Sequence, residues 1–138
     1  MKTIAYIGGT FDILHPGHLN LLEKAYNDFD MVIVALNTDE FCEQYKRKPL
    51  MTYDERRQCL LACRYVTGVV KNTGGCDSKP SIKRVMPTHI IHGDDWTGEA
   101  YMKQLGIDKD FLKKHNIKQK YYPYTKSIST TDLLKRLK

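Results

Sequence analysis

Short apolar runs alternate with segments of helical periodicity along the whole chain. Residues 3–7 are apolar and β-prone, and they run into Gly8 and Gly9, as expected for a buried strand that ends in a tight turn. Residues 31–36 form a continuous apolar run suited to a strand covered on both faces. Further strands are predicted at 66–70, 88–92 and 118–124.

Helices are predicted between these strands. Proline suits a first helical turn, and after Pro16 the residues Leu19, Leu22, Tyr26 and Phe29 recur at helical spacing. The pairs Thr52-x-x-Glu55 and Ser129-x-x-Asp132 have the spacing of residues that cap a helix. The remaining helical segments are expected from about residue 39, from 52 to about 63, from Pro80 to Met86, over 97–115 with a break near Gly106, and from 129 onwards.

This alternation of strands and helices predicts an α/β fold. Right-handed β-α-β crossovers give a mostly parallel sheet covered by helices on both faces, so we expect a Rossmann-like three-layer sandwich with five strands. A length of 138 residues fits a single domain over 1–138. Because such sheets bind ligands beyond the carboxyl ends of their strands, the functional residues should follow the strands directly.

Composition and charge narrow the class of partner. With 22 basic and 16 acidic residues the net charge is +6, which suggests an anionic partner such as a nucleotide, a phosphate ester or a nucleic acid. The apolar run at 31–36 is far shorter than the ~20 residues of a membrane helix, and no secretory leader is recognisable, so a cytoplasmic protein without a membrane span is expected. The four cysteines are expected to be reduced and not to bind a metal.

The turn after the first strand, GGTFDILHPGH at residues 8–18, contains the most informative chemistry. Its glycines let the backbone approach a ligand, and the helix that follows directs amide groups and a positive dipole toward an anion. His15 and His18 are three residues apart and should lie on one side of the first helical turn. We interpret the pair as a phosphate clamp, although either histidine alone could be structural.

Two further turns follow predicted strands. HGDDW at 92–96 offers carboxylates for a ribose or a base amine, and an indole for stacking. Alternatively, its carboxylates only cap a helix. SISTTDLLKRL, from Ser127, offers hydroxyls and amides for phosphate oxygens, or again only a serine cap. Because all three turns follow strands, they should meet at one edge of the sheet.

Together these motifs identify a family. GTFDILHPGH resembles the H-x-G-H signature of the nucleotidyltransferase superfamily, and GDDW with ISTT resembles its cytidylyltransferase branch, most closely the bacterial enzymes that act on glycerol 3-phosphate. The resemblance covers almost the whole chain and includes TDEF at 38–41, Arg56 and RYV at 64–66. It implies transfer of CMP from CTP to a phosphate ester with release of pyrophosphate, a divalent cation such as Mg²⁺, and a homodimer that uses the RYV region.

The resemblance also implies roles for individual residues. His15 and His18 would hold the α-phosphate in the transition state, with Lys46 and Arg47 as cations near the substrates. The nucleotide would be bound by Gly9, Thr10, Phe11, Gly17, Arg64, Gly93, Asp94, Asp95, Trp96, Lys126, Ile128, Ser129, Thr130 and Thr131.

The acceptor is the second substrate, and Asp12, Arg56 and Lys79 are predicted to bind it. The enzymes that use glycerol 3-phosphate have Arg-Thr-Glu-Gly before ISTT, where this chain has Tyr-Thr-Lys-Ser at 124–127. Lys126 would replace the missing arginine only as a point charge. Glycerol 3-phosphate is the first choice of acceptor, and ethanolamine phosphate, choline phosphate or another polyol phosphate are the alternatives.

Other functions fit these motifs less well. An adenylyltransferase shares H-x-G-H, but GDDW favours CTP. A catalytically silent nucleotide sensor is disfavoured by the intact histidine pair. The chain shows no helix-turn-helix or RNA-binding signature, so a nucleic-acid partner is not expected.

Overall fold

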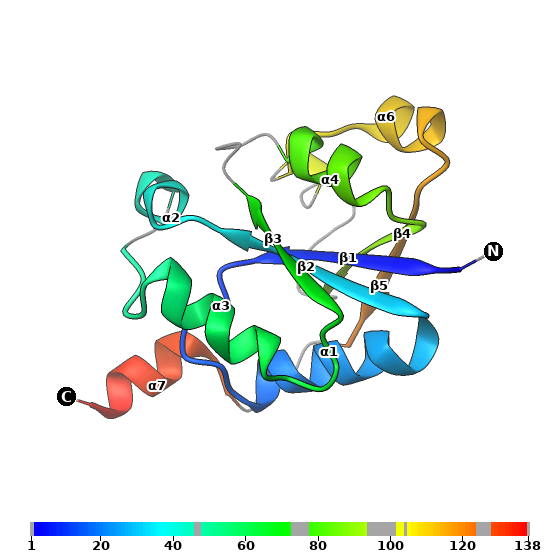
Figure 1. Ribbon diagram of the computed structural model, residues 1–138. Helices are drawn as coiled ribbons and strands as arrows, with labels where there is room; N and C mark the ends of the chain where they lie inside the picture. The colour runs from blue at the N-terminus through cyan, green and yellow to red at the C-terminus, as the bar shows by residue number, and fades with distance from the viewer. Residues whose placement is uncertain are drawn as a thin grey trace.

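The computed structural model describes residues 2–45, 48–72, 78–93, 102–103, 105–123 and 128–137. Its centre is one five-stranded sheet with the strand order β3-β2-β1-β4-β5 (Figure 1). Every pairing between neighbouring strands is parallel. The sheet and the helices on its two faces confirm the predicted Rossmann-like three-layer sandwich.

The five strands lie close to the predicted apolar runs. They are β1 (Ile4–Gly9), β2 (Met31–Asn37), β3 (Gly68–Asn72), β4 (His89–Gly93) and β5 (Lys118–Tyr122). The largest shift is in β3, which begins two residues later than expected. The hydroxyl of Thr67 accepts a hydrogen bond from the Val32 amide just before this strand pairs with β2.

The helices also follow the prediction in position. They are α1 (Pro16–Asp28), α2 (Asp39–Tyr45), α3 (Tyr53–Leu61), α4 (Lys79–Val85), α6 (Lys109–Lys114) and α7 (Thr130–Arg136). Gly106 has φ 72° and lies between α6 and the helical residues 102–103 and 105, where a break was expected. No helix in the described part of the chain is long and apolar enough to cross a membrane.

The helical spacing after Pro16 predicts α1 correctly, but not all of the residues in that pattern are buried. Leu22 and Ala25 are the residues of α1 that are fully buried, whereas Tyr26 is 45% exposed and Phe29 lies beyond the last helical residue. A small residue is buried at position 25 because α1 packs closely against the sheet, and a pattern based on large side chains does not detect this contact.

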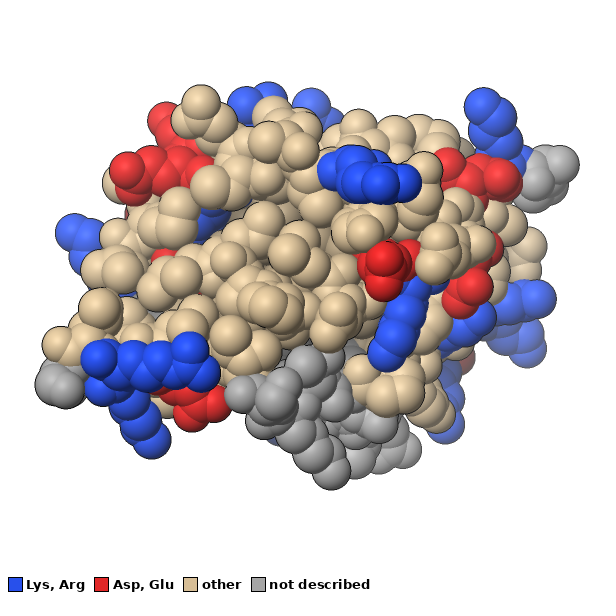
Figure 2. All heavy atoms as spheres, turned by 90° about the horizontal axis from the view of Figure 1, so that it is seen from below, with Lys and Arg blue, Asp and Glu red and all other residues tan. Residues whose placement is uncertain are grey.

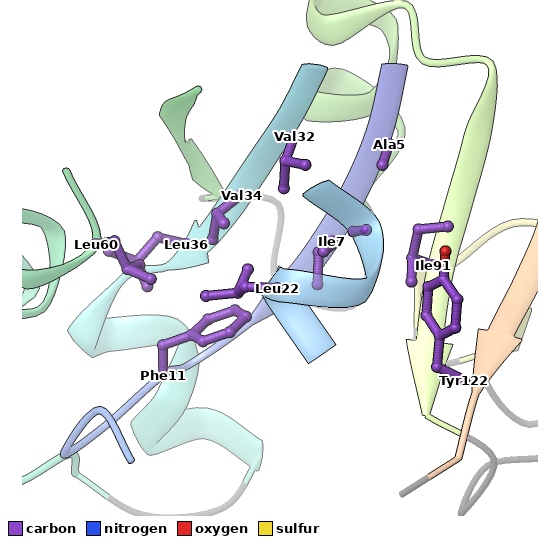
Figure 3. Close-up of a cluster of buried hydrophobic side chains, with 11 residues drawn as sticks. Ala5, Ile7, Phe11, Leu22, Val32, Val34, Leu36, Leu60, Ile91 and Tyr122 are labelled. Carbon is purple, nitrogen blue, oxygen red and sulfur yellow. The ribbon is translucent and has the colours of Figure 1, made fainter. Parts of the chain in front are cut away.

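Two apolar clusters hold the layers together. One joins α1 and α3 to the sheet and includes Ile7, Val34 and Leu60 (Figure 3). The other joins α4 and α6 to the opposite face and includes Ile82 and Phe111. With both faces covered, the carboxyl ends of the strands form the edge at which polar side chains of the turns gather.

Candidate active site

The two histidines of the first turn form the N-terminal cap of α1. His15 is the N-cap residue, and its Nδ1 accepts a hydrogen bond from the Gly17 amide at 3.0 Å. His18 occupies the third helical position, and its Nδ1 accepts from the His15 amide at 3.4 Å. The rings stack with centroids 3.8 Å apart, so the prediction that they lie together on one side of the turn is confirmed.

Burial affects the charge of both imidazoles. It lowers the pKa of His15, and it lowers the pKa of His18 from 6.5 to about 3, with a further contribution from the neighbouring His15. The carboxylate of Asp12 acts in the opposite direction on His18, but more weakly. Both rings are therefore neutral near pH 7 in the free protein.

The turn that leads to the histidines is strained. Phe11 and Ile13 have φ values of 51° and 52°, a left-handed conformation that is rare for any residue except glycine and costly for a β-branched one. Phe11 is only 7% exposed and its ring lies 5.1 Å from that of His18. Strain of this kind persists where the surrounding packing fixes a functional geometry.

The start of α7 meets the histidines, as the convergence of turns predicts. The Thr130 hydroxyl donates to the Asp12 carbonyl at 2.8 Å and lies 3.3 Å from Nε2 of His15. The Ile128 carbonyl would be 3.3 Å from a β-carbon placed on Gly17. Ser129 caps α7 by accepting from the Asp132 amide, which confirms the capping prediction, and Thr131 is exposed.

Asp12 differs from its predicted role as a contact for the acceptor. It is 3% exposed, and its two carboxylate oxygens accept hydrogen bonds from the amides of Leu50 and Met51 at 2.8 and 3.0 Å. The carboxylate therefore anchors the segment that follows the basic run at 46–48. The structure makes Asp12 a residue that positions this segment.

Arg56 is likewise a structural residue rather than the predicted acceptor contact. Its side chain has no exposed surface, and its guanidinium forms an ion pair with Asp39 at 2.7 Å. It also donates to the carbonyls of Thr10, Asn37 and Met51 at 2.8, 2.9 and 3.1 Å. These bonds use the planar fork of arginine to join the ends of β1 and β2 to the start of α3.

A chain of buried amides supports Thr10. The Asn72 side chain donates to the Asn37 side chain at 3.0 Å, and Asn37 in turn donates to the Thr10 hydroxyl at 3.2 Å. Asn37 and Asn72 are 5% and 2% exposed. The Thr10 hydroxyl also lies 3.4 Å from the Cys42 sulfur.

Other predicted residues are placed less centrally. Arg64 follows α3, just before β3 begins, so it lies at the amino ends of the strands, with its guanidinium 5.6 Å from the Tyr65 ring centroid. The crossover through α3 carries the chain to the edge opposite the histidines, so Arg64 lies away from them in the same chain, and its role in nucleotide binding stays a prediction. Lys79 begins α4 at the carboxyl edge, but on the other face of the sheet from α1.

Gly9 and Gly93 are the last residues of β1 and β4, whereas the sequence placed them in the turns that follow these strands. A β-carbon on Gly9 would be 2.8 Å from the Phe11 ring, so the close turn requires glycine there. The predicted site residues Lys46, Arg47, Asp94, Asp95, Trp96 and Lys126 lie outside the described residues.

Sequence reasoning missed the capping role of the histidines and the amide chain. The His-x-x-His spacing is that of a capping box, with imidazoles in place of the usual hydroxyl and carboxyl groups. The sequence therefore did contain a signal for the capping role of the histidines. No signal identified Asn37 and Asn72, because their pairing depends on β2 and β3 being neighbours.

Comparison with known proteins defines the class to which this fold and site belong. The cytidylyltransferase-like family matches residues 6–136, and the chain belongs to that family. A glycerol-3-phosphate cytidylyltransferase of Bacillus subtilis is 37% identical over 132 residues, covering 96% of this chain and 93% of the relative. Another from Staphylococcus aureus is 34% identical over 136 residues, covering 99% and 94%.

A solved structure agrees on the fold. The lipopolysaccharide core biosynthesis protein from Thermoplasma volcanium superposes with a TM-score of 0.75 at 22% identity, covering 93% of this chain and all of that one.

Proposed function

We propose that this protein transfers CMP from CTP to a small phosphate ester, with glycerol 3-phosphate as the acceptor, and releases pyrophosphate. The main support for this proposal is the stacked His15–His18 pair at the start of α1. Thr130, at the start of α7, contacts His15. The activity is that named for relatives that match this chain over nearly its whole length.

The acceptor needs no general base in this reaction. A phosphate monoester has a second pKa of about 6, so its oxygen is already a nucleophile at neutral pH. It attacks the α-phosphorus of CTP, a new P–O bond forms, and the bond to the β-phosphate oxygen breaks. Catalysis then consists of holding the groups in line and stabilising charge on the α-phosphate.

In this proposal the described residues contact different parts of the triphosphate of CTP. The first turn and the histidines contact the α-phosphate, with Thr10 directed by Asn37. The start of α7 presents Thr130 to the triphosphate beside His15. Arg56 and Asp12 take no direct part, and they hold the surrounding segments in place.

Magnesium would supply further neutralisation of phosphate charge, but the described residues contain no group of three or more side chains suited to hold a metal. The carboxylates of Asp12 and Asp39 are already bonded to amides and to Arg56. Mg²⁺ commonly binds through substrate phosphates and water with few protein ligands, so we propose that it enters with CTP.

The nucleotide and the acceptor are tested together by pyrophosphate release. We expect turnover with CTP and glycerol 3-phosphate and none with ATP. Release with ATP alone would select an adenylyltransferase, and no release with either nucleotide would select a binding protein. Ethanolamine phosphate, choline phosphate and another polyol phosphate complete the acceptor panel.

One substitution separates glycerol 3-phosphate from the amine esters. Tyr124→Arg introduces an arginine where the family has one, so we expect it to raise kcat/KM for glycerol 3-phosphate and to lower it for ethanolamine phosphate. A wild type that uses the amine ester and ignores glycerol 3-phosphate would reject our choice of acceptor.

We also propose that the protein is a homodimer in the cytoplasm. The layer of α1 and α3 carries Tyr26 and Leu61, each 45% exposed, and the Tyr26 ring packs 5.4 Å from that of Tyr65 in the RYV segment. Seen from below, a broad uncharged area occupies the middle of the molecule (Figure 2). The described cysteines Cys42, Cys59 and Cys63 are free thiols, which suits a reducing compartment.

A further inference from the structure

We propose that His15 and His18 act on the nucleotide phosphate as neutral Nε2–H donors, and that the cap of α1 fixes this protonation state. The inference rests on the proposed function for the identity of the phosphate. The state of the rings themselves follows from hydrogen bonds within the free protein.

The protonation of His15 is set by its two ring nitrogens. Nδ1 accepts from the Gly17 amide at 3.0 Å, so its lone pair is occupied and the proton of the neutral ring is on Nε2. Nε2 lies 3.3 Å from the Thr130 hydroxyl oxygen. That hydroxyl gives its own proton to the Asp12 carbonyl at 2.8 Å, so its oxygen is left to accept from the imidazole.

The protonation of His18 is set in the same way, by the other hydrogen bond of the capping box. Its Nδ1 accepts from the His15 amide at 3.4 Å, which again leaves the ring proton on Nε2. A doubly protonated ring would donate from both nitrogens and could accept neither capping bond. Charging either histidine would thus cost a hydrogen bond at the start of α1.

Packing between the rings reinforces the neutral state. Centroids 3.8 Å apart with planes 26° from parallel would bring two positive charges into direct contact. The Phe11 ring, whose centroid lies 5.1 Å from that of the His18 ring, offers no hydrogen-bonding partner for a charge. The Asp12 carboxylate favours the charged form of His18, but burial has the larger effect and lowers the pKa of His18.

Neutral donors are sufficient for the proposed reaction. The acceptor oxygen carries no proton when it attacks, and pyrophosphate leaves with its electron pair, so no proton need pass through the imidazoles. In the free protein the Nε2–H of His15 points to the Thr130 hydroxyl oxygen, and in the complex an α-phosphate oxygen would replace that hydroxyl as its acceptor. The Nε2–H of His18 would provide a second directed hydrogen bond to the α-phosphate. Positive charge at the reaction centre must come from other groups, for which the basic run at 46–48 and the Mg²⁺ that accompanies CTP are the candidates.

Nuclear magnetic resonance tests the ring state without any turnover. In protein labelled with ¹⁵N-histidine, long-range ¹H–¹⁵N correlations distinguish the two neutral tautomers and the imidazolium. The chain has five histidines, and the single variants His15→Gln and His18→Gln assign the two signals. His115, which is exposed, serves as the internal reference.

We expect both rings to be in the neutral Nε2–H form at pH 7, with and without bound CTP. The Nδ1–H tautomer, or an imidazolium in the CTP complex, would overturn the proposal. Because the free protein is measured as well, the tautomer is determined even if the protein proves to have no cytidylyltransferase activity.

Kinetics provide the second test, because the glutamine amide is a neutral donor near the position of Nε2. We expect His18→Ala to lower kcat about a hundredfold, as for one lost transition-state donor, and His18→Gln to lose only about tenfold. Equal losses in the two variants would indicate that a charged ring is needed, and would contradict the proposal.

Discussion

Gly17 illustrates how closely the first turn is packed around the histidines. A β-carbon at this residue would lie 2.7 Å from Cε1 of His15 and 3.3 Å from the Ile128 carbonyl. The amide of the same residue donates to the His15 ring. Position 17 therefore has no room for a side chain, and only glycine allows the backbone there to hold the imidazole in place.

The catalytic effect that we propose for the histidines and their structural effect can be measured separately. We expect His15→Ala to lower turnover about a hundredfold, because one donor to the transition state is lost. The same variant loses the cap of α1, which costs about 1 kcal/mol of unfolding free energy. Pyrophosphate release measures the first effect and urea denaturation the second. Near-full activity in this variant would contradict the phosphate clamp, and His115→Ala is the surface control.

Stability should depend on pH through His18. Its pKa falls from 6.5 to about 3 on folding, so at intermediate pH the unfolded chain binds a proton that the folded chain does not. The resulting stability is fully present above about 6.5 and is lost as the pH falls towards 3. We expect His18→Gln to flatten the fall in unfolding free energy between pH 6.5 and 4, measured by denaturation at each pH. An unchanged slope would mean that His18 is not buried as a neutral ring.

At the scale of elements, Arg56 links more segments than its place on α3 suggests. Thr52 and Glu55 form the predicted capping box, with hydrogen bonds of 2.9 and 3.3 Å between side chain and backbone. That box starts the helix, and the next residue reaches back to the ends of β1 and β2. The local cap and the long-range bonds together set where α3 begins.

Replacing Arg56 by lysine should destabilise the protein by at least about 2 kcal/mol. A lysine keeps the charge but cannot satisfy the carbonyls of Thr10, Asn37 and Met51 together, and an unsatisfied buried polar group costs about 1–3 kcal/mol. Arg57→Lys is the matched control, because Arg57 is exposed, and it should change stability by less than about 0.5 kcal/mol. Denaturant unfolding of both variants makes the comparison. Equal stability would contradict the role of Arg56.

At the scale of the whole molecule, the parallel sheet brings segments that are distant in sequence to one edge. The first turn and the start of α7 are separated by more than a hundred residues, yet Thr130 bonds to Asp12 and contacts His15. Arg64 lies at the opposite edge, three residues after the exposed Leu61 that ends α3. The two edges therefore have different roles in our proposal, one for nucleotide binding and one for subunit contact.

The subunit contact can be tested by sedimentation. We expect the wild type to sediment with about twice its chain mass of 16.0 kDa and Leu61→Lys to shift it towards the monomer, since a charge would be buried in the contact. Met86→Lys is the control, because Met86 is 77% exposed at the end of α4 on the other side of the sheet. A wild type that remains at the monomer mass at all concentrations would reject the dimer.

The order of elements, the parallel sheet and the meeting of the histidine turn with ISTT could be predicted from the sequence. Apolar runs such as 31–36 are continuous because both faces of the sheet are covered, and Thr52, Glu55, Ser129 and Asp132 show their caps in local spacing. Such features depend on residues only a few positions apart, and the sequence displays those directly.

The roles of Asp12, Arg56 and Asn37 and the place of Arg64 were decided only by the tertiary structure. A motif match indicates which residues a family shares, but a charged side chain binds substrate only if folding leaves its polar atoms available. Asp12 and Arg56 are bonded to distant backbone groups, and the crossover through α3 carries Arg64 to the far edge. These contacts join residues from 17 to 46 positions apart, and their pairing is set by which strands become neighbours.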